Sequence, residues 1–239
     1  MSKDLKKILT ALKFGDISEE EAIHTINQLF HAPIKTLNLP EIINCVGIPP
    51  QQIQKKIAGL MDQEKAFIAI KANEDVFNYV RLNVPDIFFY DEGHVIFSKP
   101  PAINNLHNNK ISVLSTNFTD PVAVEEAYIV SRMCGIEAYK HMDIGQFGEN
   151  LTENDHEILK NTQFIIYVTS GYHPNIDWLQ STYHVPVILV PIIKKDMLFM
   201  EQMNIMSSVL FSGTRNVLRT SFNAAGDAAL VASQLLLSV

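Results

Sequence analysis

The stretch "KISVLSTNFTDPVAVEEA", residues 110–127, decides the fold class of this chain. An apolar run ends at Leu114, a short polar loop follows, and a helix is predicted to begin at Pro121. The same alternation recurs in "IEAYKHMD" (136–143), "TQFIIYVTS" (162–170) and "VPVILVP" (185–191), with helix-length segments between them. Strands that are apolar on both faces and separated by helices indicate a parallel sheet covered on both sides. We therefore predict an α/β fold, a three-layer αβα sandwich with a parallel sheet, over residues 110–239.

The region before this sheet is predicted to be helical. Apolar residues at helical spacing, followed by Gly15 and then by a capping box of Ser18 and Glu21, predict a helical hairpin over residues 3–31. Residues 39–64 predict a second helical pair with a break at "GIPP". A strand pair or extended arm then leads into a Pro/Asn-rich linker at 99–109. The predicted domains are a helical region with this arm, 1–98, and the α/β domain, 110–239.

Composition limits the possible partners. The 47% of hydrophobic residues is ample for a buried core, and the net charge of −7 argues against a general binder of nucleic-acid backbones. Residues 41–60 nevertheless have helix–turn–helix spacing, with Lys55 and Lys56 on the exposed side, so DNA stays open beside a plain helical hairpin. Cys45 and Cys134 are in no metal-ligand spacing, which predicts buried reduced thiols and no metal site.

Two sequence features bear on location. No apolar run approaches the roughly 18 residues of a membrane span. The basic, amphipathic N-terminus has no small-residue cleavage site of a signal peptide. We expect a cytoplasmic protein that does not enter a membrane.

Candidate site residues follow the predicted strands, because ligands bind at the carboxyl ends of parallel strands. The first loop offers hydroxyls and Asp120, which could act on a ligand or simply cap the helix after it. Asp143, Gly145 and Gly148 form a DxGxxG turn, although such glycines often serve only the backbone. His173 could exchange protons near neutral pH, or be an ordinary surface residue. Lys194 could hold a phosphate or carboxylate, or be a solvated surface lysine.

Several of these motifs, in this order, resemble one family. Residues 111–239 resemble the PurE-like AIR carboxylase domain, and the chain is most similar to the LarB family of pyridinium-3,5-biscarboxylic acid mononucleotide synthases. The resemblance rests on "TDPVAVEEA", "DIGQFG", "VPVILVP" and "GDAALVASQLL", and on an N-terminal segment in which Asp75, Arg81, Pro85 and Asp86 match the family's pattern.

The chain departs from that family at its site. Tyr172 stands at the glutamate position of the third loop, and the family's paired histidines are replaced by Val76 and Phe77. The position of the cysteine nucleophile is held by Leu210 or, with a small shift, by Ser207 or Ser208. The family carboxylates the pyridine ring of nicotinic acid adenine dinucleotide after a thiolate adds to it, and a serine hydroxyl adds poorly.

The resemblance therefore implies a protein that binds a nucleotide or dinucleotide, such as AMP or a nicotinate dinucleotide, with lost or altered chemistry. Alternatives are an active LarB-type carboxylase/hydrolase and a non-catalytic oligomeric sensor or DNA- or protein-interaction module. The predicted catalytic residues are Asp120 and His173. The predicted ligand-binding residues are Ser115, Thr116, Asn117, Thr119, Glu126, Asp143, Gly145, Gly148, Ser170, Gly171, Tyr172 and Lys194.

Assembly and cofactors follow from the same resemblance. PurE-like domains form octamers through buried terminal helices, and "AGDAALVASQLLLSV" (225–239) is small and apolar on nearly all faces. We expect a homo-oligomer, in the family's form an octamer. A Mg²⁺ requirement would be inherited together with active chemistry, and no other cofactor is implied.

Overall fold

The computed structural model describes residues 3–14, 16–18, 21–22, 39–99, 109–116, 121–170, 175–194, 196–211 and 217–238. The chain divides into two compact units, one spanning residues 1–38 and the other residues 39–237. In the described residues, no helix is long and apolar enough to cross a membrane.

The first unit contains helix α1 (Lys3–Phe14), which agrees with the predicted first helix. The predicted capping box is also confirmed: the Ser18 amide donates to Glu21 Oε2 at 2.9 Å, and the Glu21 amide donates to Ser18 Oγ at 3.1 Å. Residues 21–22 are helical, and residues 23–31 of the predicted second helix lie outside the described residues.

A five-stranded parallel sheet forms the core of the second unit. Its strands are β5 (Lys110–Ser115), β6 (Glu137–His141), β7 (Phe164–Thr169), β8 (Val187–Pro191) and β9 (Val217–Arg219), in the order β6-β5-β7-β8-β9. This is the doubly wound order 2-1-3-4-5, whose topological switch point lies between β5 and β7. β8 is buried at all five positions, as a central parallel strand should be.

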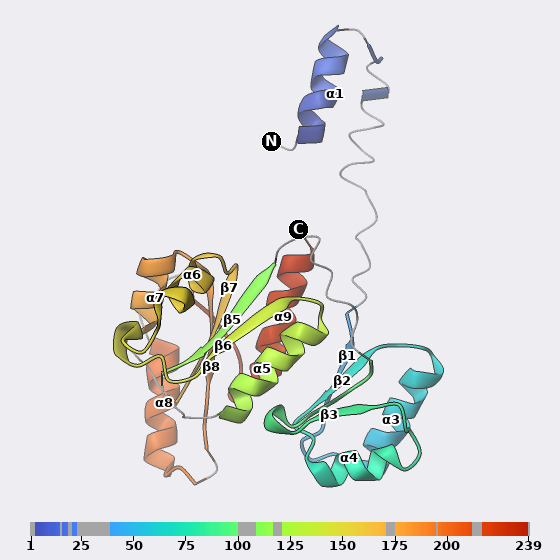
Figure 1. Cartoon of the computed structure of the whole chain (residues 1–239), viewed down its shortest axis with the longest axis vertical. Helices are drawn as coiled ribbons and strands as arrows, with labels where there is room; N and C mark the ends of the chain where they lie inside the picture. Colours follow the sequence, from blue (N-terminus) through green and yellow to red (C-terminus); the bar gives the residue numbers. More distant parts are fainter. Residues whose placement is uncertain are drawn as a thin grey trace. The chain divides into compact units, whose positions relative to one another are not determined.

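Helices cover both faces of this sheet (Figure 1). Helices α5 (Pro121–Met133) and α9 (Ala225–Leu237) cover one face, and α6 (Glu153–Lys160) and α7 (Asn175–Tyr183) cover the other. A short 3₁₀ turn η3 (Gln146–Gly148) follows β6, and α8 (Phe199–Phe211) precedes β9. The predicted three-layer αβα sandwich is confirmed.

A smaller, mixed sheet lies in the same unit. It has the order β1-β2-β4-β3, from strands β1 (Glu41–Asn44), β2 (Phe67–Ile70), β3 (Phe88–Tyr90) and β4 (Val95–Phe97). β1 and β2 are parallel, and helix α3 (Pro50–Asp62) connects them. Helix α4 (Glu74–Arg81) and the 3₁₀ turn η1 (Asp91–Gly93) complete it. The predicted strand pair in residues 80–98 is confirmed by the antiparallel β3–β4 hairpin.

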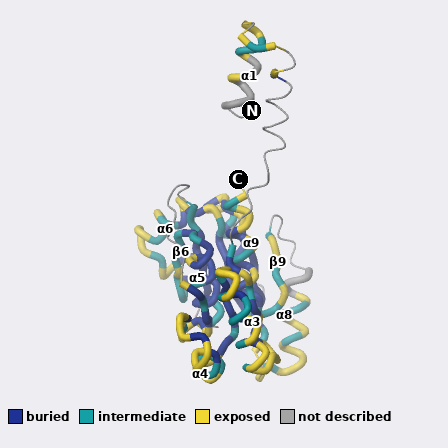
Figure 2. The backbone as a smooth tube through the Cα atoms, turned by 90° about the vertical axis from the view of Figure 1, so that its right-hand side faces the viewer, coloured by how far each residue is buried: buried dark blue, intermediate teal, exposed yellow. Residues whose placement is uncertain are grey.

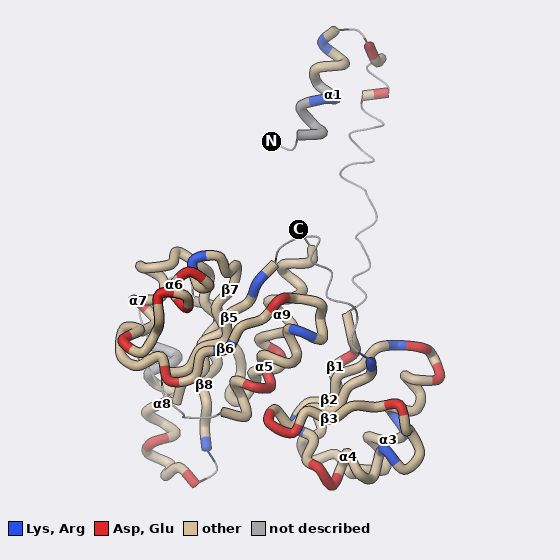
Figure 3. The backbone as a smooth tube through the Cα atoms, in the orientation of Figure 1, with Lys and Arg blue, Asp and Glu red and all other residues tan. Residues whose placement is uncertain are grey.

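The predicted helical pair at 39–64 is wrong in its first half, and the helix–turn–helix interpretation is wrong with it. Residues 41–44 form a strand because Ile42 and Ile43 pair with Ile68 and Ala69 of β2, far along the chain. β-Branched side chains fit such a pleated, half-buried surface. Figure 3 also shows acidic and basic residues interspersed along both sheets, so the described residues in this view gather no continuous basic face.

Helices α5 and α9 pack against both sheets. In β2, Phe67 and Ala69 pack toward α3 and α4, whereas Ile68 and Ile70 share a core cluster with α5 and α9. Figure 2 shows α5 largely buried. Four alanines of α9 are fully buried and permit close packing on α5: Ala225, Ala228, Ala229 and Ala232. The small residues of α9 therefore have partners within the chain, and contact with another subunit stays a prediction.

Glycine permits the close approach of the β3–β4 hairpin to α5. A Cβ atom on Gly93 would lie 3.1 Å from the backbone carbon of Glu125 and 3.1 Å from the amide nitrogen of Glu126. Backbone atoms cannot rotate aside, so only glycine fits without a shift. This contact helps to set the small sheet against the helix layer of the large one.

Candidate functional site

The ends of three strands and the start of helix α5 meet at one cavity of about 560 Å³. From the small sheet, the residues just after β1 (Cys45, Val46 and Gly47) and after β2 (Lys71 and Asn73) line it. From the large sheet come Ile192, after β8, and the first turns of α5, which follows β5: Val122, Ala123 and Glu126. Val76, His94 and Asn223 complete the lining. Open α/β sheets bind ligands outside the carboxyl ends of their strands, and here two sheets direct those ends to one place.

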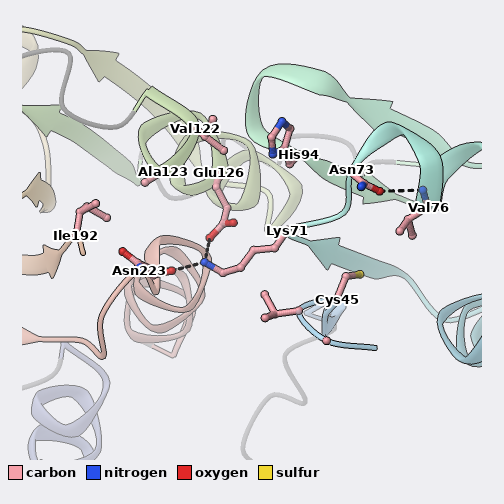
Figure 4. Close-up of a pocket in the computed structure, with 12 residues that line it drawn as sticks. Cys45, Lys71, Asn73, Val76, His94, Val122, Ala123, Glu126, Ile192 and Asn223 are labelled. Carbon is pink, nitrogen blue, oxygen red and sulfur yellow. Dashed lines mark hydrogen bonds and ion pairs between the residues drawn. The ribbon is translucent and has the colours of Figure 1, made fainter. Parts of the chain in front are cut away.

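Lys71 crosses the cavity from the small sheet to the large domain (Figure 4). Its Nζ donates a short hydrogen bond to the carbonyl oxygen of Asn223 and lies 3.8 Å from Oε1 of Glu126. The Glu126 side chain is 3% exposed, and its Oε1 accepts a 2.8 Å hydrogen bond from the Gly226 amide at the start of α9. The predicted ligand-binding residue Glu126 therefore lies in the cavity wall, beside a lysine that the motifs did not include.

Three non-glycine cavity residues have left-handed backbone, and Asn223, with φ +56°, is one of them. Lys71 has φ +57° and His94 has φ +52°, and the Ala72 amide, next to Lys71, donates a 2.8 Å hydrogen bond to the His94 carbonyl. This conformation costs a residue with a Cβ atom about 1–2 kcal/mol. Strained backbone of this kind clusters at binding and catalytic sites, where the surrounding structure holds it.

Two helix N-termini adjoin the cavity, and they differ. Helix α4 is capped by the Asn73 side chain, which accepts from the Val76 amide at 3.0 Å, and its first turn carries Glu74 and Asp75. Helix α5 has no acidic side chain in its first turn, which lines the cavity through Val122 and Ala123.

Cys45 does not replace the nucleophile of the resembled family. Burial raises the pKa of its thiol to about 11, so the thiolate is scarce at neutral pH. Burial likewise raises the pKa of Cys134 to about 11, against a smaller lowering by its hydrogen bond with Ser233. Both cysteines are buried and free, as predicted. In the described part of the chain, no group of three His, Cys, Asp or Glu side chains could hold a metal ion.

A buried polar cluster lies at the switch point between β5 and β7. Tyr167 is fully buried, and its hydroxyl makes a short hydrogen bond with Thr116 Oγ1, just after Ser115, the buried last residue of β5. Burial raises the pKa of Tyr167, although hydrogen bonds with the side chains of Thr116, Asn175 and Thr169 lower it. Asn175, also fully buried, donates to the Gly145 carbonyl at 2.8 Å and accepts from the Phe147 amide at 2.7 Å. The cluster thus links Thr116 after β5, the turn after β6 and the start of α7.

Packing accounts for the DxGxxG turn. A Cβ atom on Gly148 would lie 2.3 Å from the Trp178 ring, and one on Gly145 would lie 2.5 Å from the Glu149 side chain. The Asp143 carbonyl accepts from the Asn150 side chain at 3.1 Å, within the same turn. A ligand role for these three residues stays a prediction.

The remaining predicted residues are placed as follows. Ser170 is half-buried after β7, and Lys194 is exposed beyond the end of β8. Both predicted catalytic residues, Asp120 and His173, lie outside the described residues, together with Asn117, Thr119, Gly171 and Tyr172. Four residues of the resembled N-terminal segment are exposed and line no part of the cavity: Asp75, Arg81, Pro85 and Asp86. Val76, at one position of the family's paired histidines, does line it.

Sequence reasoning missed the contribution of the small sheet. Asn73 had a readable signal, because Asn before Glu and Asp is typical of a helix N-cap. Lys71, His94 and Asn223 had none, since only the packing of the small sheet on α5 and α9 brings them together.

Comparison with known proteins adds little to this site. No family model matches the chain, and neither does any curated protein. A pilus assembly-related protein from Burkholderia pseudomallei has a TM-score of 0.33 and 15% identity, over 54% of this chain and 92% of that chain. The RPS4 and RRS1 TIR domain heterodimer gives a TM-score of 0.34 and 13% identity, over 54% and 94% respectively. Likeness at these scores is too slight to bear on function.

Proposed function

We propose that this chain binds a nucleotide or dinucleotide in the cavity where the ends of β1, β2 and β8 meet the start of α5. The observation that carries the proposal is the convergence of two sheets, because the ends of β1, β2 and β8 and the start of α5 line one volume of about 560 Å³. That volume lies within the range of about 300–1,000 Å³ that is usual for small-molecule sites.

The lining suits such a ligand. Val46, Val76, Val122 and Ile192 supply apolar surface for a flat ring. Lys71, Asn73 and Asn223 supply the few polar groups that fix orientation. A nucleotide combines these two needs in one molecule.

The proposed relationship is to PurE-like AIR carboxylase domains, and within them to the LarB family. A parallel sheet covered by helices on both faces supports it. We propose that the carboxylase/hydrolase chemistry is lost or altered, because the cysteine that lines the cavity has a pKa raised to about 11 by burial. Ring carboxylation through a thiolate is unfavourable for such a thiol.

Assembly and location complete the proposal. We propose a homo-oligomer, in the family's form an octamer, and a cytoplasmic location, which the two free thiols support. On α9, Val231 and Leu235 lie four residues apart and are 42% and 43% exposed, so they form one apolar strip on the surface. A monomer in light scattering at micromolar concentration would refute the oligomer.

Calorimetric titration with AMP, nicotinic acid adenine dinucleotide and aminoimidazole ribonucleotide tests the binding, followed by mass spectrometry of the mixtures. Ala123→Phe fills the cavity and should abolish binding, whereas Thr182→Phe, on the exposed side of α7, should not. Binding with conversion of the ligand would restore the enzyme interpretation. If none of the three binds the wild-type chain, the proposal fails.

A further inference from the structure

Lys71 presents an ammonium group to the cavity under conditions that suit an anion. The residue follows the last residue of β2, and its side chain is 26% exposed, so the charge is neither buried nor freely solvated. Its left-handed φ of +57° is energetically unfavourable for a residue with a Cβ atom, and the surrounding fold maintains it at this position.

The partners of Lys71 leave hydrogen-bond donor positions of its ammonium available to a ligand. An ammonium has three donor positions. One is used on the Asn223 carbonyl, which is neutral. Glu126 Oε1, at 3.8 Å, is beyond hydrogen-bonding distance and already accepts from the Gly226 amide at 2.8 Å. The carboxylate is thus committed to the start of α9 and compensates the lysine charge only at a distance.

The α5 N-terminus supplies a second attraction for negative charge on the same cavity wall. Its first turn lines the cavity through Val122 and Ala123, and no acidic residue stands between Pro121 and Val124; Asp120, which precedes the helix, lies outside the described residues. An anion drawn by the helix dipole would therefore lie toward α5, where Lys71 also points.

We propose that Lys71 is the anion-binding residue of this cavity, and that a phosphate or carboxylate of the ligand lies beside its ammonium, next to the start of α5. The inference rests on the proposed function and adds to it the chemical class of the group that is recognised. It also assigns that recognition to the small sheet rather than to the loops of the large one.

Matched pairs of charged and uncharged probes test it on the full chain. AMP against adenosine measures the contribution of a phosphate, and nicotinic acid against nicotinamide measures that of a carboxylate. We expect wild type to prefer the charged member of at least one pair by about tenfold or more. Lys71→Met should remove that preference and Lys71→Arg should keep it. Lys56→Met, which removes an exposed lysine paired with Glu41 at 3.2 Å, should change nothing.

A second variant keeps the test decisive if Lys71→Met unfolds. Glu126→Gln removes the competing carboxylate charge while keeping an acceptor for the Gly226 amide, so it should raise the affinity for the charged probe and leave the uncharged one unchanged. Equal affinities within both pairs, or a preference that survives Lys71→Met, overturn the inference and leave nucleotide binding standing. If none of the four probes binds while nicotinic acid adenine dinucleotide or aminoimidazole ribonucleotide does, this inference alone is overturned; if none of these ligands binds, both proposals are.

Discussion

The hydroxyl of Tyr90 donates a 2.7 Å hydrogen bond to Oε2 of Glu125 and so fastens the β3–β4 hairpin to α5. The other carboxylate oxygen of Glu125 accepts from Lys140 of β6 at 2.5 Å. Glu125 is 6% exposed, so it is a buried charge that depends on its partners. One carboxylate thereby joins the small sheet to an edge strand of the large one.

Removing the Tyr90 hydroxyl should weaken the fold. Tyr90→Phe takes one partner from a buried carboxylate, and we expect the free energy of unfolding to fall by about 1–3 kcal/mol. Urea denaturation measures this. Tyr79→Phe, on α4, is the matched control and should stay within about 0.5 kcal/mol of wild type. Equal losses in the two variants would contradict a specific role for the Tyr90–Glu125 contact.

Alkaline pH should destabilise the chain partly through the same residue. Burial, then the hydrogen bond to Glu125 and its charge, raise the pKa of Tyr90 well above its usual value. The folded state therefore keeps a proton that the unfolded state releases near pH 10, and stability falls as pH rises above about 10. Tyr90→Phe should make the decline in unfolding free energy between pH 9 and 11 shallower. An unchanged slope would show that Tyr90 does not titrate differently in the two states.

Gly148 should tolerate no side chain. Its φ is +76°, and a Cβ atom there would lie 2.3 Å from the Trp178 ring, so Gly148→Ala should cost about 2 kcal/mol or more. A Cβ atom on Gly59 of α3 would have nothing within 4 Å, so Gly59→Ala should be stabilising by about 0.5–1 kcal/mol. Thermal unfolding of both variants checks the contrast. A Gly148→Ala protein as stable as wild type would show that the DxGxxG turn has room for a side chain and that packing does not require glycine there.

The large sheet was predictable because each of its central strands is apolar on both faces and the helices between them are long enough to cross over. β1 was not, because a strand of four residues carries too little pattern and depends on a partner more than 20 residues away. Glu126 was predicted as a ligand-binding residue from the resemblance of "TDPVAVEEA" to a family motif, and it lines the cavity. Lys71 and His94 were not, because tertiary packing alone sets their backbone conformation and brings them to the cavity.

Low pH should destabilise the folded chain through His141, at the end of β6. Its Nδ1 lies 3.2 Å from Asp155 Oδ1, and burial lowers the pKa of His141 against a smaller raising by Asp155. The unfolded state therefore takes up a proton near pH 6.5 that the folded state resists, and stability falls as pH drops from 7 to 5. His141→Gln should flatten that part of the unfolding profile, and His184→Asn, at an exposed position, should not. Parallel profiles for wild type and His141→Gln would contradict this assignment.

The Lys71–Glu126 pair offers a measurement that joins stability to binding. A double-mutant cycle with Lys71→Met and Glu126→Gln should give a coupling of about 0.2–1 kcal/mol without ligand, because the 3.8 Å separation and the partly exposed lysine weaken the attraction. An anion beside the ammonium would compete with Glu126, so the coupling should decrease at saturating AMP. A coupling that stays constant at saturation would place the phosphate elsewhere in the cavity and leave Lys71 as a purely structural link between the two sheets.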